Sequence, residues 1–295
     1  MKVHHLNCIS SCPLGGHMMD GITPTSFERA HICNHCLLIE GAHGLTLVDT
    51  GFGLRDVANP SSRLSSFFLF MNKPDFIESL TAIRQIEKLG FKASDVRDIV
   101  LTHLDFDHAG GLDDFPEARV HMLDLEKRHA EMRKTWLDRQ RFRPQQWNYK
   151  QNWQTYSSAS GDTWNGFEKV TPITELHDDI ALIPLVGHTH GHAGVAVKSE
   201  RGWMLHAGDA YFHRDEMNFK NPSCTPGMRM YQTLMEKDRK SRLQNQDRLR
   251  ALKKNLVDEI DLFCAHDPIE LENMQQPSIR NQPAPDISVS PFDLT

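Results

Sequence analysis

Short apolar runs alternate with polar stretches along the chain, and most of these runs have the length of a buried strand. A helical pattern, with apolar residues at 76, 80, 83, 86 and 89, precedes one of them and stops at Gly90. Strands that alternate with crossover helices predict an α/β protein in which helices are layered on sheets. The runs that predict strands are 2–8, 36–39, 45–48, 98–101, 118–123, 180–186, 193–197, 203–207 and 260–263.

Three further segments complete the expected organisation, which is a single domain over residues 1–274. Residues 54–72 are rich in Ser and Phe and predict an irregular insertion, where Phe67 to Met71 forms either a dimer patch or a buried anchor. Residues 228–256 predict one long helical stretch, whose interleaved charges favour a solvated face. Residues 275–295 carry prolines among polar neighbours, which predicts a flexible tail.

An insertion at about 130–168 differs from the rest of the chain in composition. Most of the tryptophans (Trp136, Trp147, Trp153 and Trp164) lie in it, with several arginines among them. One hypothesis is that these aromatic residues pack a satellite core against the body of the protein. The other is that they form a cap over the functional site and shape a substrate pocket. One segment can do both.

Composition narrows the class of protein. The chain has 295 residues, 39% of them apolar, and a formal net charge of −6. These values are ordinary for a globular protein, and the negative balance argues against nucleic-acid or anionic-membrane partners. The longest bulky apolar run is far shorter than the ~20 residues of a spanning helix. Because the N-terminus lacks the apolar core of a signal peptide, we expect a cytoplasmic protein.

Four of the six cysteines, Cys8, Cys12, Cys33 and Cys36, lie near the N-terminus. Cys33 and Cys36 have zinc-like spacing, but no second pair follows at a suitable distance. In a cytoplasmic chain we expect them to be reduced and to pack as small apolar residues. An extra structural metal is the alternative.

The most informative stretch is Thr102 to Gly111. Four metal-capable side chains, His103, Asp105, Asp107 and His108, follow an apolar strand within six positions. On an extended backbone, side chains two residues apart point the same way, so His103 and Asp105 would share a side. Mixed imidazoles and carboxylates suit zinc, iron or manganese better than calcium or magnesium. A polar strand end with chance histidines is the alternative interpretation.

This stretch resembles the His-x-His-x-Asp-His signature of the metallo-β-lactamase superfamily, with Asp105 in place of the second His. The resemblance spans about residues 30 to 268 and implies an αββα sandwich of two mixed β-sheets flanked by helices. Four further segments match the family's order, namely 47–51, 187–189, 208–210 and 264–267.

The resemblance also implies a dinuclear metal site. In this site Asp107 would orient a metal-bound hydroxide and Asp49 would lie beneath the metals. Tyr211, two residues after Asp209, either steadies an oxyanion or packs in the core. We expect two divalent ions, foremost Zn²⁺, although the harder carboxylate of Asp105 also admits iron or manganese. By position, His103, Asp105 and His188 would hold the first ion, Asp107, His108 and His266 the second, and Asp209 would bridge both.

The function that the resemblance implies is metal-dependent hydrolysis. The pattern is most similar to N-acyl homoserine lactonases, so the expected reaction opens a lactone or cleaves a related ester-type bond. The expected substrate is a small molecule with an acyl or aromatic part. Asp105 motivates one alternative, a di-iron oxidoreductase of the same fold. A phosphodiesterase or organophosphate hydrolase is another, because these enzymes attack a similar centre.

Overall fold

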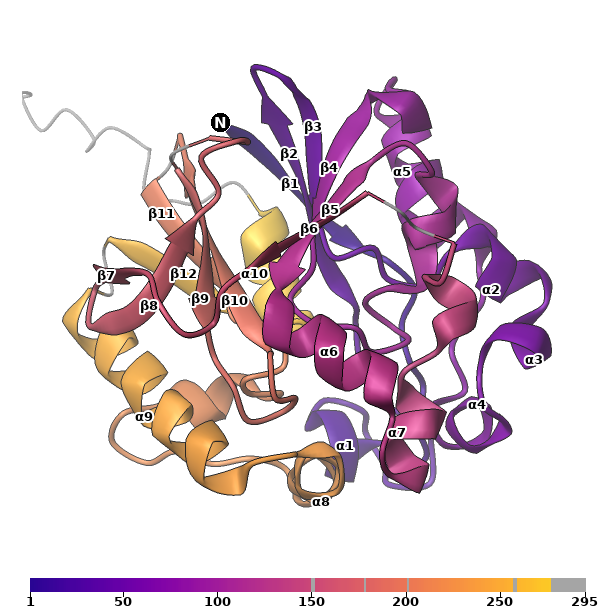
Figure 1. Cartoon of the computed structure of the whole chain (residues 1–295). Helices are drawn as coiled ribbons and strands as arrows, with labels where there is room; N and C mark the ends of the chain where they lie inside the picture. Colours follow the sequence, from indigo (N-terminus) through magenta and orange to yellow (C-terminus); the bar gives the residue numbers. More distant parts are fainter. Residues whose placement is uncertain (150–151, 178, 201, 257–258, 277–295) are drawn as a thin grey trace, which may run out of the picture.

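The computed structural model describes residues 1–149, 152–177, 179–200, 202–256 and 259–276. Its strands form two mixed sheets that face one another, and the chain completes the first sheet before it begins the second (Figure 1). In order across the first sheet lie β1 (Lys2–Asn7), β2 (His35–Gly41), β3 (Gly44–Val48), β4 (Val96–Val100), β5 (Arg119–Leu123) and β6 (Trp153–Tyr156). In order across the second lie β12 (Ile260–Phe263), β11 (Gly202–His206), β10 (Ala193–Ser199), β9 (Ile180–Pro184), β8 (Phe167–Pro172) and β7 (Asp162–Trp164).

Helices cover the outer faces of both sheets. On the first sheet lie α5 (Ala82–Lys88) and α6 (Asp124–Met132), and on the second lies α9 (Arg239–Asn255) (Figure 1). The predicted αββα sandwich is therefore confirmed. The other helical elements are α1 (His17–Asp20), α2 (Leu54–Ala58), α3 (Pro60–Arg63), α4 (Ser66–Asn72), η1 (Glu78–Leu80), η2 (Ala93–Asp95), η3 (Gly110–Asp114), α7 (Trp136–Arg141), η4 (Pro144–Gln146), η5 (Arg214–Met217), α8 (Pro226–Met235) and α10 (Pro268–Gln275).

Alternation along the strands explains the layers. In β2, Leu37 and Ile39 join the core between the two sheets, whereas Cys36 and Leu38 join the core shared with α5. Successive strand residues point to opposite faces, so a strand buried on both sides needs an apolar run rather than alternation. This is why the strands were visible in the sequence as continuous apolar runs.

Two helical expectations need correction. Residues 54–72 are not irregular: they form α2, α3 and α4, with Pro60 at the start of α3 and the Ser65 hydroxyl accepting from the Phe68 amide at 3.3 Å. The helix expected from 76 begins only at Ala82, because residues 78–80 form a 3₁₀ turn. Within α4, Phe68 is buried and Phe70 is exposed, so the segment anchors itself through Phe68. A dimer through this segment stays a prediction.

The long helix expected at 228–256 is broken in two. Between α8 and α9 the chain turns at residues 236–238, and Asp238 caps α9 by accepting from the Ser241 amide at 3.1 Å. The amides of Lys237 and Asp238 donate instead to the carbonyl of Gly187, at 2.8 and 3.0 Å. The break thus holds the residue just before His188.

The aromatic segment packs mainly into the body of the protein. Trp147 and Trp153 join the core on the first sheet, and Trp164 packs against Trp203 on the second. Trp136 is largely exposed and contacts Phe67. These positions match the satellite-core hypothesis. Of the expected tail, 277–295 lie outside the described residues.

Among the helices of the described residues, none is both long and apolar enough to cross a membrane.

Candidate metal centre

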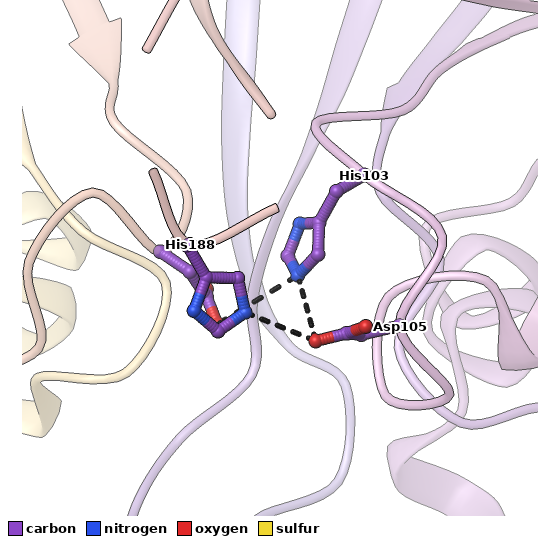
Figure 2. Close-up of side chains that lie close together, drawn as sticks. His103, Asp105 and His188 are labelled. Atoms are coloured by element: carbon purple, nitrogen blue, oxygen red, sulfur yellow. Dashed lines mark hydrogen bonds and ion pairs between the residues drawn. The ribbon is translucent and has the colours of Figure 1, made fainter. Parts of the chain in front are cut away.

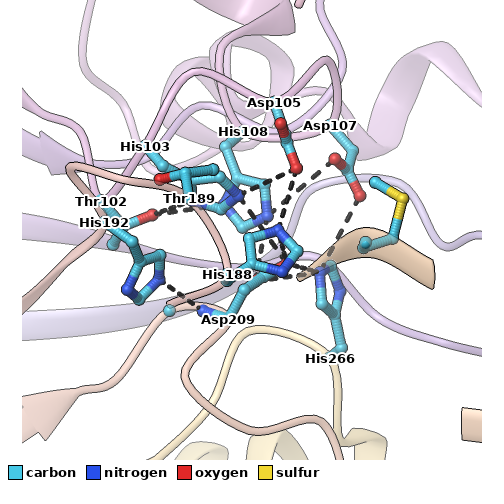
Figure 3. Close-up of polar contacts among 12 residues, drawn as sticks. Thr102, His103, Asp105, Asp107, His108, His188, Thr189, His192, Asp209 and His266 are labelled. Atoms are coloured by element: carbon cyan, nitrogen blue, oxygen red, sulfur yellow. Dashed lines mark hydrogen bonds and ion pairs between the residues drawn. The ribbon is translucent and has the colours of Figure 1, made fainter. Parts of the chain in front are cut away.

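The predicted ligands meet at one edge of the sandwich, beyond the carboxyl ends of four strands (Figure 3). The connection after β4 carries the stretch from His103 to His108. His188, Asp209 and His266 follow β9, β11 and β12. These three strands run in the same direction, because β10 pairs antiparallel with both β9 and β11, and β11 pairs parallel with β12. Ligands far apart in the sequence therefore reach the same place.

Four ligands form a first buried group, His103, Asp105, His188 and Asp209. The Asp105 Oδ2 atom lies 3.3 Å from His103 Nε2 and 3.0 Å from His188 Nε2 (Figure 2). Asp209 Oδ2 lies 3.3 Å from His188 Nε2 and 3.7 Å from His103 Nε2. Tetrahedral zinc ligands at about 2.0–2.2 Å from the ion are about 3.3–3.6 Å apart. The four distances in the first group, from 3.0 to 3.7 Å, scatter around this range.

A second buried group consists of Asp107, His108 and His266. The other Asp209 oxygen, Oδ1, lies 3.3 Å from His108 Nε2 and 3.2 Å from His266 Nε2. Asp107 is farther away, with an oxygen 4.0 Å from His108 Nε2 and another 3.9 Å from His266 Nε2. Asp209 Oδ2 is also 3.2 Å from His266 Nε2, so this carboxylate lies between the two groups and contacts both.

Both groups contain buried polar atoms that lack a partner. Within the described part of the chain, His103 Nε2, His108 Nε2 and Asp209 Oδ1 have no hydrogen-bond partner. Buried polar groups are ordinarily paired, and leaving one unpaired costs about 1–3 kcal/mol. A cation in each group would satisfy all three atoms. The residues present thus fit a pair of divalent ions.

Hydrogen bonds fix the orientation of the imidazoles. Asp49, which has the positive φ of 55°, accepts from His108 Nδ1 and the Thr102 hydroxyl, both at 2.7 Å. His266 Nδ1 donates to the Cys33 carbonyl at 2.8 Å. When either ring is neutral its proton lies on Nδ1, and its Nε2 lone pair then faces the second group. Asp49 lies where the resemblance implied.

Asp209 is held by a histidine that is not itself in either group. His192 Nε2 accepts from the Asp209 amide at 2.8 Å, and His192 Nδ1 donates to the Leu185 carbonyl at 3.0 Å. Gly208 permits this approach, because a Cβ there would lie 2.6 Å from His192 Nε2 at a φ of +52°. His190, by contrast, is exposed and stacks near His129.

Glu126 ties together the loops of the first group. Its carboxylate accepts from the amides of Leu104 and Gly191, at 3.0 and 3.2 Å, and from the Thr189 hydroxyl. Burial raises the pKa of Glu126 to about 7, against the lowering effect of these hydrogen bonds. Glu126 lies on α6, and no local pattern in the sequence indicated this role.

Neighbouring side chains and burial shift the pKa values of the residues in the site. Burial opposes ionisation of Asp209, but His266 and His108 hold the pKa of its carboxyl well below the usual range. Burial, with the nearby His108, lowers the pKa of His103 to about 4. A neutral His103 keeps a lone pair on Nε2, as a metal ligand requires.

Asp107 and His266 also line a narrow pocket of about 20 Å³. Its walls are mostly apolar and include Met19 and Met228. Tyr231 also lines the pocket. Asn72 Nδ2 donates to the Tyr231 hydroxyl at 3.4 Å. Sequence reasoning missed Tyr231 because it lies in a stretch whose charges predicted a solvated helix. The remaining lining residues are Ser11, Pro13, Ile32, Asn72 and Phe212.

Tyr211 takes a different place from the one expected. It is fully buried in the core between the second sheet and α9, and its hydroxyl donates to the Glu270 carboxylate at 3.0 Å. Phe212, the next residue, stacks on His266 with ring centroids 5.2 Å apart. The structure thus gives Tyr211 a packing role and offers Tyr231 as the tyrosine beside the metal ligands.

The four N-terminal cysteines are buried and free. Within the described ranges, the groups of side chains suited to a metal are the two above, and neither includes a cysteine. Cys8 and Cys36 belong to the core of the first sheet. The structure agrees with the interpretation that these cysteines pack as small apolar residues.

Comparison with known proteins identifies the family. The metallo-β-lactamase superfamily profile matches residues 34–257. A probable metallo-hydrolase of Mycobacterium tuberculosis is 39% identical over 270 residues, which are 91% of this chain and 81% of that protein. The chain therefore belongs to the metallo-β-lactamase superfamily. An N-acyl homoserine lactonase of a Bacillus species is 28% identical over 214 residues, covering 71% of this chain and 77% of its own length.

Solved structures agree on the fold. An N-acyl homoserine lactone hydrolase with the product N-hexanoyl-L-homoserine at its catalytic metal centre superposes with a TM-score of 0.67 at 19% identity, covering 92% of this chain and 95% of that one. At this identity the likeness shows the fold alone. With relatives named metallo-hydrolase and lactonase, the expected enzyme class, a metallo-hydrolase, is confirmed. The fold and its ligand groups imply divalent metal ions.

Proposed function

We propose that the protein hydrolyses a lactone or a related ester-type bond in a small molecule, with two divalent ions held by the seven predicted ligands. The observation that carries this proposal is the position of Asp209. Its carboxylate lies between the two groups: Oδ2 is 3.3 Å from His188 Nε2, Oδ1 is 3.3 Å from His108 Nε2, and both oxygens are 3.2 Å from His266 Nε2. Two ions bound in these groups would supply an activated water and polarise a carbonyl oxygen.

The chain's own residues would orient the reactants. Asp107 reaches the pocket from the second group, where its carboxylate can accept a hydrogen bond from the attacking water and fix its direction. The hydroxyl of Tyr231 accepts from Asn72, so its own proton remains available to an oxygen of the substrate. Asp209 and Asp107 would therefore serve catalysis as well as metal binding, and Tyr231 takes the part first expected of Tyr211.

The pocket supports an apolar substituent on the substrate. Met19, Met228 and Phe212 form its walls, and the space between them is small. Methionine side chains are flexible and reshape around varied apolar groups. The pocket volume of about 20 Å³ has room for about one water, so an acyl chain or an aromatic ring on the substrate would require these flexible walls to move apart.

The alternative of a di-iron oxidoreductase rested on the extra carboxylate at 105. In the structure Arg141 pairs with this carboxylate, so its negative charge is balanced inside the protein. The chemical reason to prefer a harder ion is thereby weakened, and hydrolysis is the function we retain.

The test is a hydrolysis assay on natively purified protein. We expect cleavage of N-acyl homoserine lactones or aryl esters, loss of activity with a chelator, and recovery on adding zinc. The substitution Asp107→Asn should lower kcat by about a hundredfold, as expected for loss of a group that positions a reactant. Oxygen consumption with bound iron and an absence of ester or lactone cleavage would contradict the proposal.

A further inference from the structure

Arg141 is an unusual cation for the interior of a protein. It ends α7, and its side chain is completely buried. Arginine is almost never fully buried unless it is paired, because removing its charge from water is costly. Nearby Arg139, in contrast, extends along the surface and bonds to the carbonyls of Arg133 and Lys134. A partner in the metal centre must therefore offset the cost of burying the charge of Arg141.

The partner of Arg141 is Asp105, the residue that departs from the family signature. Nε donates to Asp105 Oδ1 at 2.7 Å, and Nη2 donates to Oδ2 at 2.5 Å. Nη1 donates to the Met235 carbonyl at 2.6 Å. A backbone bridge between Asp105 and Phe142 holds the two segments together. This two-point contact fixes both the position and the plane of the carboxylate.

The guanidinium touches the first ligand group at one side. Nη2 donates to His188 Nε2 at 2.7 Å. However, His103 Nε2 lacks a hydrogen-bond partner, and within the described part of the chain no ion pair joins Arg141 to Asp209. A guanidinium at the centre of the group would contact both. Arg141 therefore reaches the edge of the first group at Asp105 Oδ2 and His188 Nε2, and it leaves His103 Nε2 and Asp209 Oδ1 available to a cation.

The net charge of Asp105 and Arg141 together suggests what this pair does. The signature that this stretch resembles has a neutral imidazole where Asp105 stands. A carboxylate there adds one negative charge, and Arg141 returns one positive charge within hydrogen-bond distance. Together the two side chains present one ligand oxygen and no net charge. In these respects they resemble the imidazole that they replace.

We propose that Asp105 and Arg141 act as one neutral ligand unit, in which Arg141 is a positioning residue that keeps the first group a zinc-type site. This inference rests on the two-ion centre of the proposed function but not on its substrate. It implies that Asp105 alone would be misplaced and too anionic. It also implies that a histidine at position 105 could replace the pair if Arg141 is removed as well. With Arg141 still present, a histidine could not replace Asp105.

The test measures bound metal on folded protein by elemental analysis, with equimolar zinc and manganese in competition. We expect two zinc ions per chain in the unsubstituted protein. In Arg141→Met the first ion should bind about 10–100-fold more weakly, as for other residues that orient a metal ligand, and the zinc preference should fall. Arg141→Lys, which keeps the charge but not the two-point contact, should fall between. Arg139→Met is the matched control and should keep two zinc ions.

The double variant Asp105→His with Arg141→Met keeps the proposal falsifiable if the single variants fold poorly. It removes both buried charges, so it should fold and regain two zinc ions, whereas Asp105→His alone should lose the first ion beside an unpaired Arg141. A folded double variant with one ion would overturn the proposal. So would unchanged metal affinity in Arg141→Met, or one ion in the unsubstituted protein and two in that variant. A missing lactonase activity would refute only the proposed function.

Discussion

The two ligand groups share Asp209 but differ in what surrounds them. The carboxylate of the first group, Asp105, is gripped by Arg141 and lies outside the set of pocket-lining residues. The carboxylate of the second, Asp107, lines the pocket together with His266, and among the described residues no ion pair joins it to an arginine. The supports differ as well, since Glu126 and Arg141 brace the first group, whereas Asp49 and a backbone carbonyl orient the second.

This difference separates two tasks. A carboxylate neutralised by a buried guanidinium is a fixed ligand with little freedom to exchange partners. A carboxylate that faces a pocket is free to orient water or a substrate. We therefore infer that the first group holds its ion and the second group meets the substrate, although both would polarise the reacting atoms.

The largest effect is expected at the residue that the two groups share. Asp209→Ala removes an oxygen from each group, so both ions should bind weakly and kcat/KM should fall by about a thousandfold or more, equivalent to several kcal/mol of transition-state stabilisation. Metal content and kinetics measured together check this. Full retention of one ion with the other lost would show that Asp209 serves a single group.

A smaller loss is expected on the substrate side. Tyr231→Phe removes only a hydroxyl, so kcat should fall about a hundredfold while both ions stay bound, the lower end of the range for loss of a single donor to a developing charge. Tyr211→Phe is the matched control, because that hydroxyl bonds to Glu270 in the core. Equal effects of the two substitutions on kcat would refute the assignment of Tyr231 to the pocket.

The smallest effect concerns the brace of the first group. Burial raises the pKa of Glu126 from 4.5 to about 7. Between these values the folded protein binds more protons than the unfolded chain, so the free energy of unfolding should fall as pH rises through this range, by at most about 3 kcal/mol. Glu126→Gln cannot ionise and should flatten that slope. Thermal unfolding of metal-free protein from pH 5 to 8 checks it, and parallel curves for the two proteins would contradict it.

The sequence indicated some of the metal ligands more directly than others. The stretch from His103 to His108 could be recognised because its four ligands lie within six positions and follow an apolar strand. His188, Asp209 and His266 were found only through the order of family segments, since each stands alone after its own strand. Their convergence depends on the direction of three strands in one sheet, which no local pattern encodes.

What the sequence could not show were contacts made over long distances. Arg141 lies 36 positions after Asp105, in a segment whose tryptophans drew attention first. The break at residues 236–238 carries neither Pro nor Gly, and its signals are the Asp238 cap and the amides bound by Gly187. Such contacts arise from tertiary packing rather than from propensity.

The most direct test of the two-group centre is anomalous diffraction at the zinc absorption edge, from crystals of natively purified protein. We expect two peaks per chain about 3.5 Å apart, as in other two-metal sites. One peak should lie among His103, Asp105 and His188, the other among Asp107, His108 and His266, with Asp209 touching both. A single peak, or a peak that leaves Asp209 or His266 without contact, would contradict the centre described above.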